Sequence, residues 1–170
     1  MKSNLLFDFK VNKENKTIVV NREFDAELKL VWQACTTPEL LEQWWAPKPW
    51  RAETKSMDFS EGGHWLYAMV GPKGEKHWNM VNYISIENEK YFKAKDGFSD
   101  ENGTINTDLP QNLWENQYVS NKEQTLVIIT LTFDTLEDLE TIIKMGFKEG
   151  FTMGLNQLDE VLETLKKQVK

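Results

Sequence analysis

The stretch FKEGFTMGLNQLDEVLETL, residues 147–165, decides the fold class. Its apolar residues recur every three or four positions, as they do along one face of an α-helix. They are Phe147, Phe151, Leu155, Leu158, Val161, Leu162 and Leu165. The pattern predicts a long amphipathic helix, and its apolar face must pack against another layer of the protein.

Glycine recurs at every fourth position around the start of this helix, at Gly146, Gly150 and Gly154. Each glycine inside a helix costs roughly 1 kcal/mol relative to alanine, so three of them indicate a compensating use. Two structural uses are a break between two helices near Gly146 and a close approach of the helix to a sheet. The functional alternative is that the missing side chains leave space for a ligand between helix and sheet. Before this helix, Thr135 with Asp138 three residues later predicts the capped start of a first helical segment.

The region before the helices changes to a period of two between residues 50 and 133, which is typical of strands. We expect strands over residues 50–59, 64–70, 76–86, 91–96, 113–119 and 125–133. The last of them is the most apolar, which favours a central place in the sheet. No helical segment separates these strands, so the sheet should be mainly antiparallel. Residues 98–112 are expected to form a long loop.

The N-terminal part predicts a hairpin followed by two short helices. Residues 5–11 and 17–24 alternate between apolar and polar residues and are joined by a polar turn, which indicates two paired strands. Asp25 is expected to cap the first helix, and Thr37 the second. The sequence Ala-Pro-Lys-Pro at residues 46–49 should end the second helix, because proline disfavours helix in the residue before it.

The composition describes one globular domain. The chain has 170 residues, of which 40% are hydrophobic, so a single domain over residues 1–170 is expected. It has 20 Lys and Arg against 27 Asp and Glu, a net charge of −7, and no basic cluster, which argues against nucleic acid as a partner. No apolar run approaches the roughly 20 residues that span a bilayer.

Cysteine usage indicates the compartment. Cys35 is the only cysteine, so no intramolecular disulfide can form, and a cytoplasmic location is expected. Because Cys35 falls on the apolar stripe of the first predicted helix, we interpret it as an inert thiol rather than a nucleophile.

The order of elements and several short motifs resemble a known family. An antiparallel sheet around a C-terminal helix, with two short helices after the first strands, is similar to the α+β helix-grip fold of START-like (SRPBCC) and birch-pollen-allergen-like proteins. The motifs resemble those of the homologues of the activator of the heat-shock protein 90 (Hsp90) ATPase. They are Arg22-Glu-Phe-Asp-Ala26, Val31-Trp32, Thr37-Pro-Glu-Leu40, Trp44-Trp45-Ala-Pro47, Asp58 with Gly62-Gly63, Met145-Gly-Phe-Lys-Glu-Gly150 and Leu155-Asn-Gln-Leu158.

This resemblance implies a deep cavity between a curved sheet and the long helix, which many members use for apolar or amphipathic small molecules. It implies no common reaction, although the wider superfamily includes polyketide cyclases and aromatases. It also implies a chaperone as an alternative partner, because the founding members are co-chaperones. No cofactor is expected.

His64 and His77 are the only histidines. They lack the spacing of metal ligands on one strand or one helix, so no metal is expected and a structural role is the simpler interpretation. His77 nevertheless remains a candidate acid or base. If Trp78 faces outward, His77 shares the opposite face of its strand with Asn79 and Tyr83. That face mixes polar tips with apolar bodies, as a ligand site needs.

The strand expected at residues 113–119 offers two alternative faces. Glu115 and Gln117 share one face, and Trp114 and Asn116 share the other. The period of two does not decide which face is inward. Glu115, if buried, would have a raised pKa and could act as an acid, whereas a solvated strand face is the plainer interpretation.

A cluster of tryptophans completes the candidate site. Trp44, Trp45 and Trp50 lie beside two prolines, and such rings suit the rim of a cavity or the plug at the end of a curved sheet. The candidates on the long helix are Phe147, Gly150, Phe151 and Gly154.

Three functional hypotheses follow. The first is binding of a small apolar or amphipathic molecule between the sheet and the C-terminal helix. The second is a chaperone accessory that uses an exposed tryptophan region to stimulate an Hsp90-type ATPase. The third is an enzyme of cyclase or hydrolase type with His77, Glu115 or Tyr83 as participants, although the sequence contains no recognisable catalytic motif.

Overall fold

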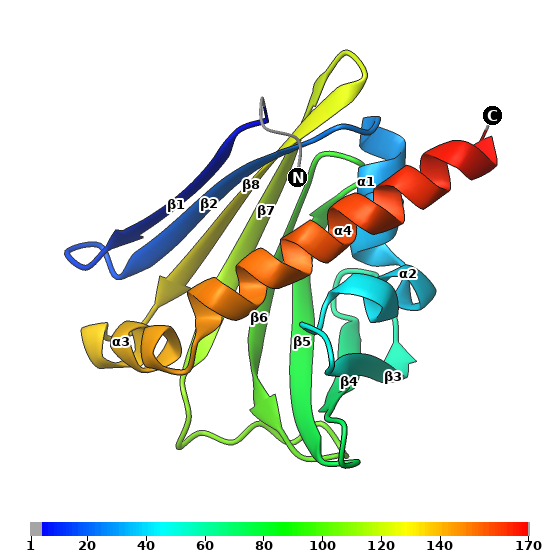
Figure 1. The fold of residues 1–170 in the computed structure, drawn as a ribbon. Helices are drawn as coiled ribbons and strands as arrows, with labels where there is room; N and C mark the ends of the chain where they lie inside the picture. The colour runs from blue at the N-terminus through cyan, green and yellow to red at the C-terminus, as the bar shows by residue number, and fades with distance from the viewer. Residues whose placement is uncertain (1–4, 170) are drawn as a thin grey trace.

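A computed structural model describes residues 5–169 of the chain, which form one eight-stranded sheet and four helices (Figure 1). The strands are β1 (Phe7–Asn12), β2 (Thr17–Phe24), β3 (Arg51–Met57), β4 (His64–Val70), β5 (Lys76–Glu87), β6 (Tyr91–Ser99), β7 (Gln111–Asn121) and β8 (Gln124–Phe133). The helices are α1 (Leu28–Thr36), α2 (Pro38–Trp44), α3 (Leu136–Lys144) and α4 (Phe147–Val169). The predicted α+β helix-grip fold is confirmed.

The strand order is β1-β2-β8-β7-β6-β5-β4-β3, and every neighbouring pair is antiparallel. Neighbouring strands of the sheet also follow each other along the chain, with the exception of β2 and β8. This pair brings together the N-terminal hairpin and the last strand, which are far apart in sequence. β8 therefore lies inside the sheet with a partner on each side, and its residue Leu131 is paired with Ile18 of β2. Its apolar run is explained by this interior position.

Helix α4 runs across the concave face of the curved sheet, called here the inner face (Figure 1). Helices α1 and α2 pack along one part of α4, and α3 lies beside its first turn. Fully buried leucines of α4 and aliphatic residues of β2 and β8 form the centre of the core. They include Ile18, Val20, Leu131, Leu155, Leu158 and Leu162.

Gly146 separates α3 from α4 and has a φ of +88°. This left-handed conformation is available to glycine without the steric penalty that other residues suffer, so it ends one helix and starts the next in a new direction. The helix break is thus the correct interpretation of this glycine. The predicted cap of α3 is also confirmed, because the Thr135 hydroxyl accepts a hydrogen bond of 3.0 Å from the Asp138 amide.

The predicted cap of the first helix is wrong. Helix α1 begins at Leu28 with Glu27 as its N-cap residue, and no side chain caps it. Asp25 lies too early in the chain for that role. It binds Lys166 instead, whose Nζ donates to the Asp25 carbonyl oxygen at 2.8 Å and to its carboxylate at 3.2 Å. The end of α4 is thereby tied to the connection between β2 and α1.

A buried arginine makes a second link between the sheet and α4. Arg22 on β2 is inaccessible to solvent, and its Nη2 donates to Asp159 at 2.6 Å and to Asn156 at 3.1 Å. Its guanidinium group also lies over the rings of Phe7 and Phe24.

The long loop predicted at residues 98–112 is shorter in the structure, since β6 extends to Ser99 and β7 begins at Gln111.

Within residues 5–169, no helix combines the length and the apolar character required to cross a membrane.

Candidate ligand-binding cavity

Two adjacent chambers lie between the inner face of the sheet and helix α4. The outer chamber has a volume of about 280 Å³ and is bordered by the turn between α3 and α4, including Met145 and Gly146. The inner chamber has a volume of about 50 Å³ and extends toward α1, where Cys35 borders it. Both chambers share the side chains of Trp45, Asp96, Trp114 and Phe151.

The strands supply the lining of both chambers through simple alternation, because successive side chains of a strand point to opposite faces. On β5, Tyr83 lines the inner chamber and Asn79 the outer one. On β6 the inward residues include Ala94 and Asp96, and on β7 they include Trp114. The cavity is therefore built on rigid paired strands.

Trp45, the residue after the last turn of α2, borders both chambers. Its ring lies between 5.3 and 6.4 Å, centre to centre, from five other aromatic rings. These rings belong to Trp44, Trp65, Tyr67, Trp114 and Phe151. The Trp45 indole donates a hydrogen bond of 2.8 Å to the Tyr67 hydroxyl. The ring of Trp45 is therefore closely packed by its neighbours, and its hydrogen bond fixes its orientation.

Helix α4 fixes the segment that carries Trp45. Gln157 is buried, and its Nε2 donates to the carbonyl oxygens of Trp44 at 3.0 Å and Ala46 at 2.8 Å. Its Oε1 accepts a hydrogen bond of 2.9 Å from the Lys48 amide. One side chain therefore satisfies three backbone groups of a segment that has no regular structure after α2.

A glycine of α4 allows this helix to come close to the end of α2. A Cβ atom at position 154 would lie 3.2 Å from the carbonyl oxygen of Trp44, so Gly154 allows the end of α2 to come close. The close approach predicted for the glycines is thus real, but the neighbour is the end of α2 rather than the sheet. Gly150 borders the outer chamber, where a Cβ atom would meet only Pro47, at 3.8 Å.

Asp96 is the unexpected residue of the cavity. It projects from β6 into both chambers, and desolvation raises its pKa from 3.8 to about 7. The indole N–H of Trp114 interacts with this carboxyl group and offsets part of the rise, but its geometry falls short of a hydrogen bond. Near neutral pH the carboxyl group is therefore divided between its protonated and ionised forms.

Asp96 can be recognised in the sequence by its phase. Residues 91–98 alternate so that Phe92, Ala94, Asp96 and Phe98 share one face, while lysines occupy the other. An acidic residue that shares the phase of apolar residues on a strand is the sequence signal for this position. The structure shows that this face is the inner one.

Three buried polar atoms of β7 have no hydrogen-bond partner among the described residues. They are Oδ1 of Asn112, Nε1 of Trp114 and Nδ2 of Asn116. Each of these side chains is more than nine-tenths buried and lines a chamber. Buried polar groups in proteins are nearly always paired, so this strip of unpaired atoms is available to a bound molecule.

Seven of the predicted site residues come together at the cavity. They are Trp44, Trp45, Asn79, Tyr83, Phe147, Gly150 and Phe151. Burial raises the pKa of the Tyr83 hydroxyl above its ordinary value, so it remains a neutral phenol. Trp44 is buried and its indole donates to the Ala34 carbonyl oxygen at 2.9 Å, so it lines the interior rather than an exposed rim.

The prediction that Glu115 and Gln117 line the cavity is wrong, because both residues lie on the outer face of the sheet. The inward face of β7 carries Trp114, Asn116 and Tyr118. Glu115 accepts a hydrogen bond of 2.8 Å from the Tyr91 hydroxyl and borders neither chamber. The face that packs on α4 is the one with the larger apolar rings, since burying them stabilises the fold most.

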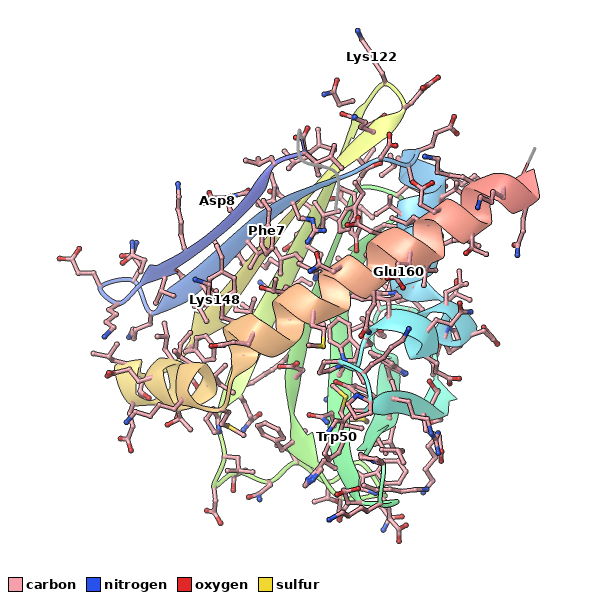
Figure 2. All side chains as sticks on the ribbon, in the orientation of Figure 1. Phe7, Asp8, Trp50, Lys122, Lys148 and Glu160 are labelled. Atoms are coloured by element: carbon pink, nitrogen blue, oxygen red, sulfur yellow. The ribbon has the colours of Figure 1, made fainter. Side chains whose placement is uncertain are left out.

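Trp50 and His77 also lie outside the cavity. Their rings pack on each other with centres 5.5 Å apart, and His77 is exposed. Figure 2 shows Trp50 near the ends of β4 and β5, away from α4. His77 has the same phase as Asn79 and Tyr83, but it lies at the start of β5, where α4 does not cover the sheet.

The other reactive side chains named from the sequence are Cys35 and His64. Burial raises the pKa of Cys35 to about 12, so it stays a thiol. His64 pairs with the Ser56 hydroxyl at 2.8 Å near the surface. In the part of the chain that the structure describes, no three His, Cys, Asp or Glu side chains come close enough together to hold a metal ion.

The comparisons with known proteins agree with this architecture. The family model described as activator of Hsp90 ATPase homolog 1-like protein matches residues 25–163. A protein from Arthrobacter aurescens, solved by NMR, is 30% identical with a TM-score of 0.87, and the match covers 92% of this chain and 91% of that one. Protein Ms6760 from Mycobacterium smegmatis is 30% identical with a TM-score of 0.84, covering 93% of this chain and 96% of that one.

A third solved structure, from Staphylococcus epidermidis, is 27% identical with a TM-score of 0.80, covering 91% of this chain and 94% of that one. No curated protein matches the chain significantly. The names of these three structures state no ligand, substrate or partner.

Proposed function

Because the chain belongs to the family of activator of Hsp90 ATPase homolog 1-like proteins and contains the cavity described above, we propose that it binds a small molecule between the sheet and α4. The molecule is apolar or amphipathic. The observation that carries this proposal is the outer chamber of about 280 Å³ with aromatic walls and a few converging polar groups.

The polar strip of β7 favours binding over a purely structural void. Leaving a buried polar atom without a partner costs about 1–3 kcal/mol. The unpaired atoms of Asn112, Trp114 and Asn116 lower the stability of the empty protein. A ligand that pairs with them recovers this free energy together with that of burying its apolar part.

The cavity can be tested with a neutral fluorescent probe, N-phenyl-1-naphthylamine, whose emission rises in apolar surroundings. Gly150→Phe places a ring in the outer chamber, and we expect it to weaken probe binding by about tenfold or more. Met153→Phe adds a similar ring to the exposed side of α4 and serves as the matched control. Absence of probe binding, or equal affinity for wild type and Gly150→Phe, would contradict the proposal.

A second candidate function comes from the description of the family, which names activation of the Hsp90 ATPase. Its test is the ATPase rate of a cognate Hsp90 with and without the protein, and an unchanged rate would count against it. Of the three tryptophans suggested for this contact, Trp44 is buried and Trp45 borders both chambers, so only the partly exposed Trp50 lies outside the cavity. The small-molecule function is therefore preferred.

A further inference from the structure

The outer chamber presents two hydrogen-bond acceptors side by side. Asp96 of β6 and Asn112 of β7 are directly paired in the antiparallel ladder, and both side chains line the chamber. Directly opposite residues have Cβ atoms about 5 Å apart, so one small group can reach both. The Asn112 Oδ1 atom has no partner among the described residues, and the Trp114 indole N–H interacts with the Asp96 carboxyl group without the geometry of a full hydrogen bond.

The charged groups of the lining disfavour an anionic ligand. Among the described residues that border the two chambers, Asp96 alone has an acidic or basic side chain. No lysine, arginine or histidine is available there to pair with an anionic ligand. A carboxylate or phosphate placed beside Asp96 would meet a like charge in surroundings of low polarity, which costs several kcal/mol more than in water.

Aromatic rings surround the same position. Trp45, Trp114, Phe147 and Phe151 all line the outer chamber, and the first two are tryptophans. The face of an aromatic ring attracts a cation, and tryptophan does so most strongly. The rings and the carboxyl group therefore favour positive charge, and the rings also favour an apolar body.

We propose that the ligand is an amphipathic amine, an apolar or aromatic body that carries a protonated amino group. The N–H groups of this amine donate hydrogen bonds to the Asp96 carboxyl group and to Oδ1 of Asn112. This inference rests on the proposed function and names the chemical class of the molecule that enters the same cavity. The apolar body occupies the chamber between Phe147 and Phe151 of α4 and the inner face of the sheet.

A protonated amine fits better than the two other head groups of similar size. A neutral alcohol can donate only one hydrogen bond, so it satisfies one of the two acceptors. An ionised acid donates none and repels the carboxylate. The pKa of Asp96 near 7 supports the same choice, because a bound cation pulls the carboxyl group to its ionised form and gains a charge-assisted hydrogen bond.

The experiment compares three naphthalenes that differ in one group: 2-naphthylmethylamine, 2-naphthalenemethanol and 2-naphthoic acid. Dissociation constants are measured by calorimetry at pH 7.5. We expect the amine to bind about tenfold tighter than the alcohol, and the acid to bind most weakly. In Asp96→Asn the affinity for the amine should fall about tenfold relative to that for the alcohol, so that the advantage of the amine disappears.

Glu115→Gln is the matched control, since it removes a carboxylate on the outer face of the neighbouring strand. It should leave all three affinities unchanged. If the alcohol binds as tightly as the amine in wild type, the inference is overturned and the proposed function stands. If the acid binds best, the inference is likewise overturned. If none of the three binds, the proposed function fails and the inference with it.

Discussion

Gln157 of α4 donates a hydrogen bond of 2.8 Å to the carbonyl oxygen of Ala46, in the segment that leads away from α2. Its other two bonds go to Trp44 and Lys48, so it holds both sides of Trp45. The position of Trp45, which borders both chambers, therefore depends on a polar side chain of helix α4. This dependence can be tested directly.

Gln157→Leu keeps the approximate size of the side chain and removes all three hydrogen bonds. The carbonyl oxygens of Trp44 and Ala46 then lose a buried donor, and we expect a loss of about 2–4 kcal/mol in the free energy of unfolding. Urea denaturation measures it. Gln168→Leu, at an exposed position of the same helix, is the control and should change stability by less than about 0.5 kcal/mol. Equal effects of the two substitutions would contradict the role of Gln157.

The raised pKa of Asp96 predicts a pH-dependent stability. Its pKa is about 7 in the folded protein and near 3.8 in an unfolded chain, so the unfolded chain loses its proton first as pH rises. The free energy of unfolding should therefore fall between about pH 4 and pH 7 and level off above that range.

Asp96→Asn should remove this contribution to the pH dependence. Above neutral pH we expect the variant to be more stable than wild type by about 2 kcal/mol, because each pKa unit corresponds to about 1.4 kcal/mol and solvent screening at the partly exposed Asp96 reduces the full effect. Thermal unfolding at a series of pH values measures the difference, which should shrink toward pH 4. A difference that stays constant with pH would show that Asp96 does not titrate as described.

Gly150 and Gly154 give a matched pair of substitutions. Alanine at position 150 meets only an ordinary contact at 3.8 Å, so Gly150→Ala should stabilise the protein by about 0.5–1 kcal/mol through helix propensity. Alanine at position 154 would press on the Trp44 carbonyl oxygen at 3.2 Å, so Gly154→Ala should lose this gain. Chemical denaturation of both variants decides the matter, and equal stabilisation would disprove the close approach at Gly154.

The Arg22 and Asp159 pair should be strongly coupled. Asp159→Asn leaves a fully buried guanidinium group without its carboxylate at 2.6 Å, and a loss of about 3 kcal/mol is expected. The double variant Arg22→Met, Asp159→Leu replaces the pair by apolar groups and should recover most of this loss. Glu53→Gln removes a carboxylate that pairs with lysine and arginine at the surface, and should change stability by less than about 0.5 kcal/mol. A double variant no more stable than Asp159→Asn would argue against the coupling.

Much of the fold could be predicted because its elements are long and periodic. Strand β8 alternates over its whole length and β7 over all but its last residues, and the apolar face of α4 extends over several turns. Local chemistry was decisive at Thr135, whose hydroxyl caps the helix after it. It was misleading at Asp25, because the pairing with Lys166 joins parts of the chain that are distant in sequence.

The site was harder to predict for a geometric reason. Alternation divides a strand into two faces but does not say which face meets the helix, so Glu115 was a candidate although it lies outside. It also does not say how far along a strand the helix reaches, which is why His77 was a candidate. Asp96 is hard to recognise from the sequence, because an acidic residue on a strand ordinarily faces solvent, whereas this one shares the phase of Phe92, Ala94 and Phe98.

The pairing of β2 with β8 has a consequence for how the protein is made. The hairpin of β1 and β2 leaves the ribosome early, but its partner in the sheet is the last strand to be synthesised. Long-range pairing of this kind folds slowly, because a large loop must close before the contact forms. During translation the inner edge of β2 therefore stays unpaired until β8 emerges, and the nascent chain is most exposed to aggregation and to chaperones in that interval.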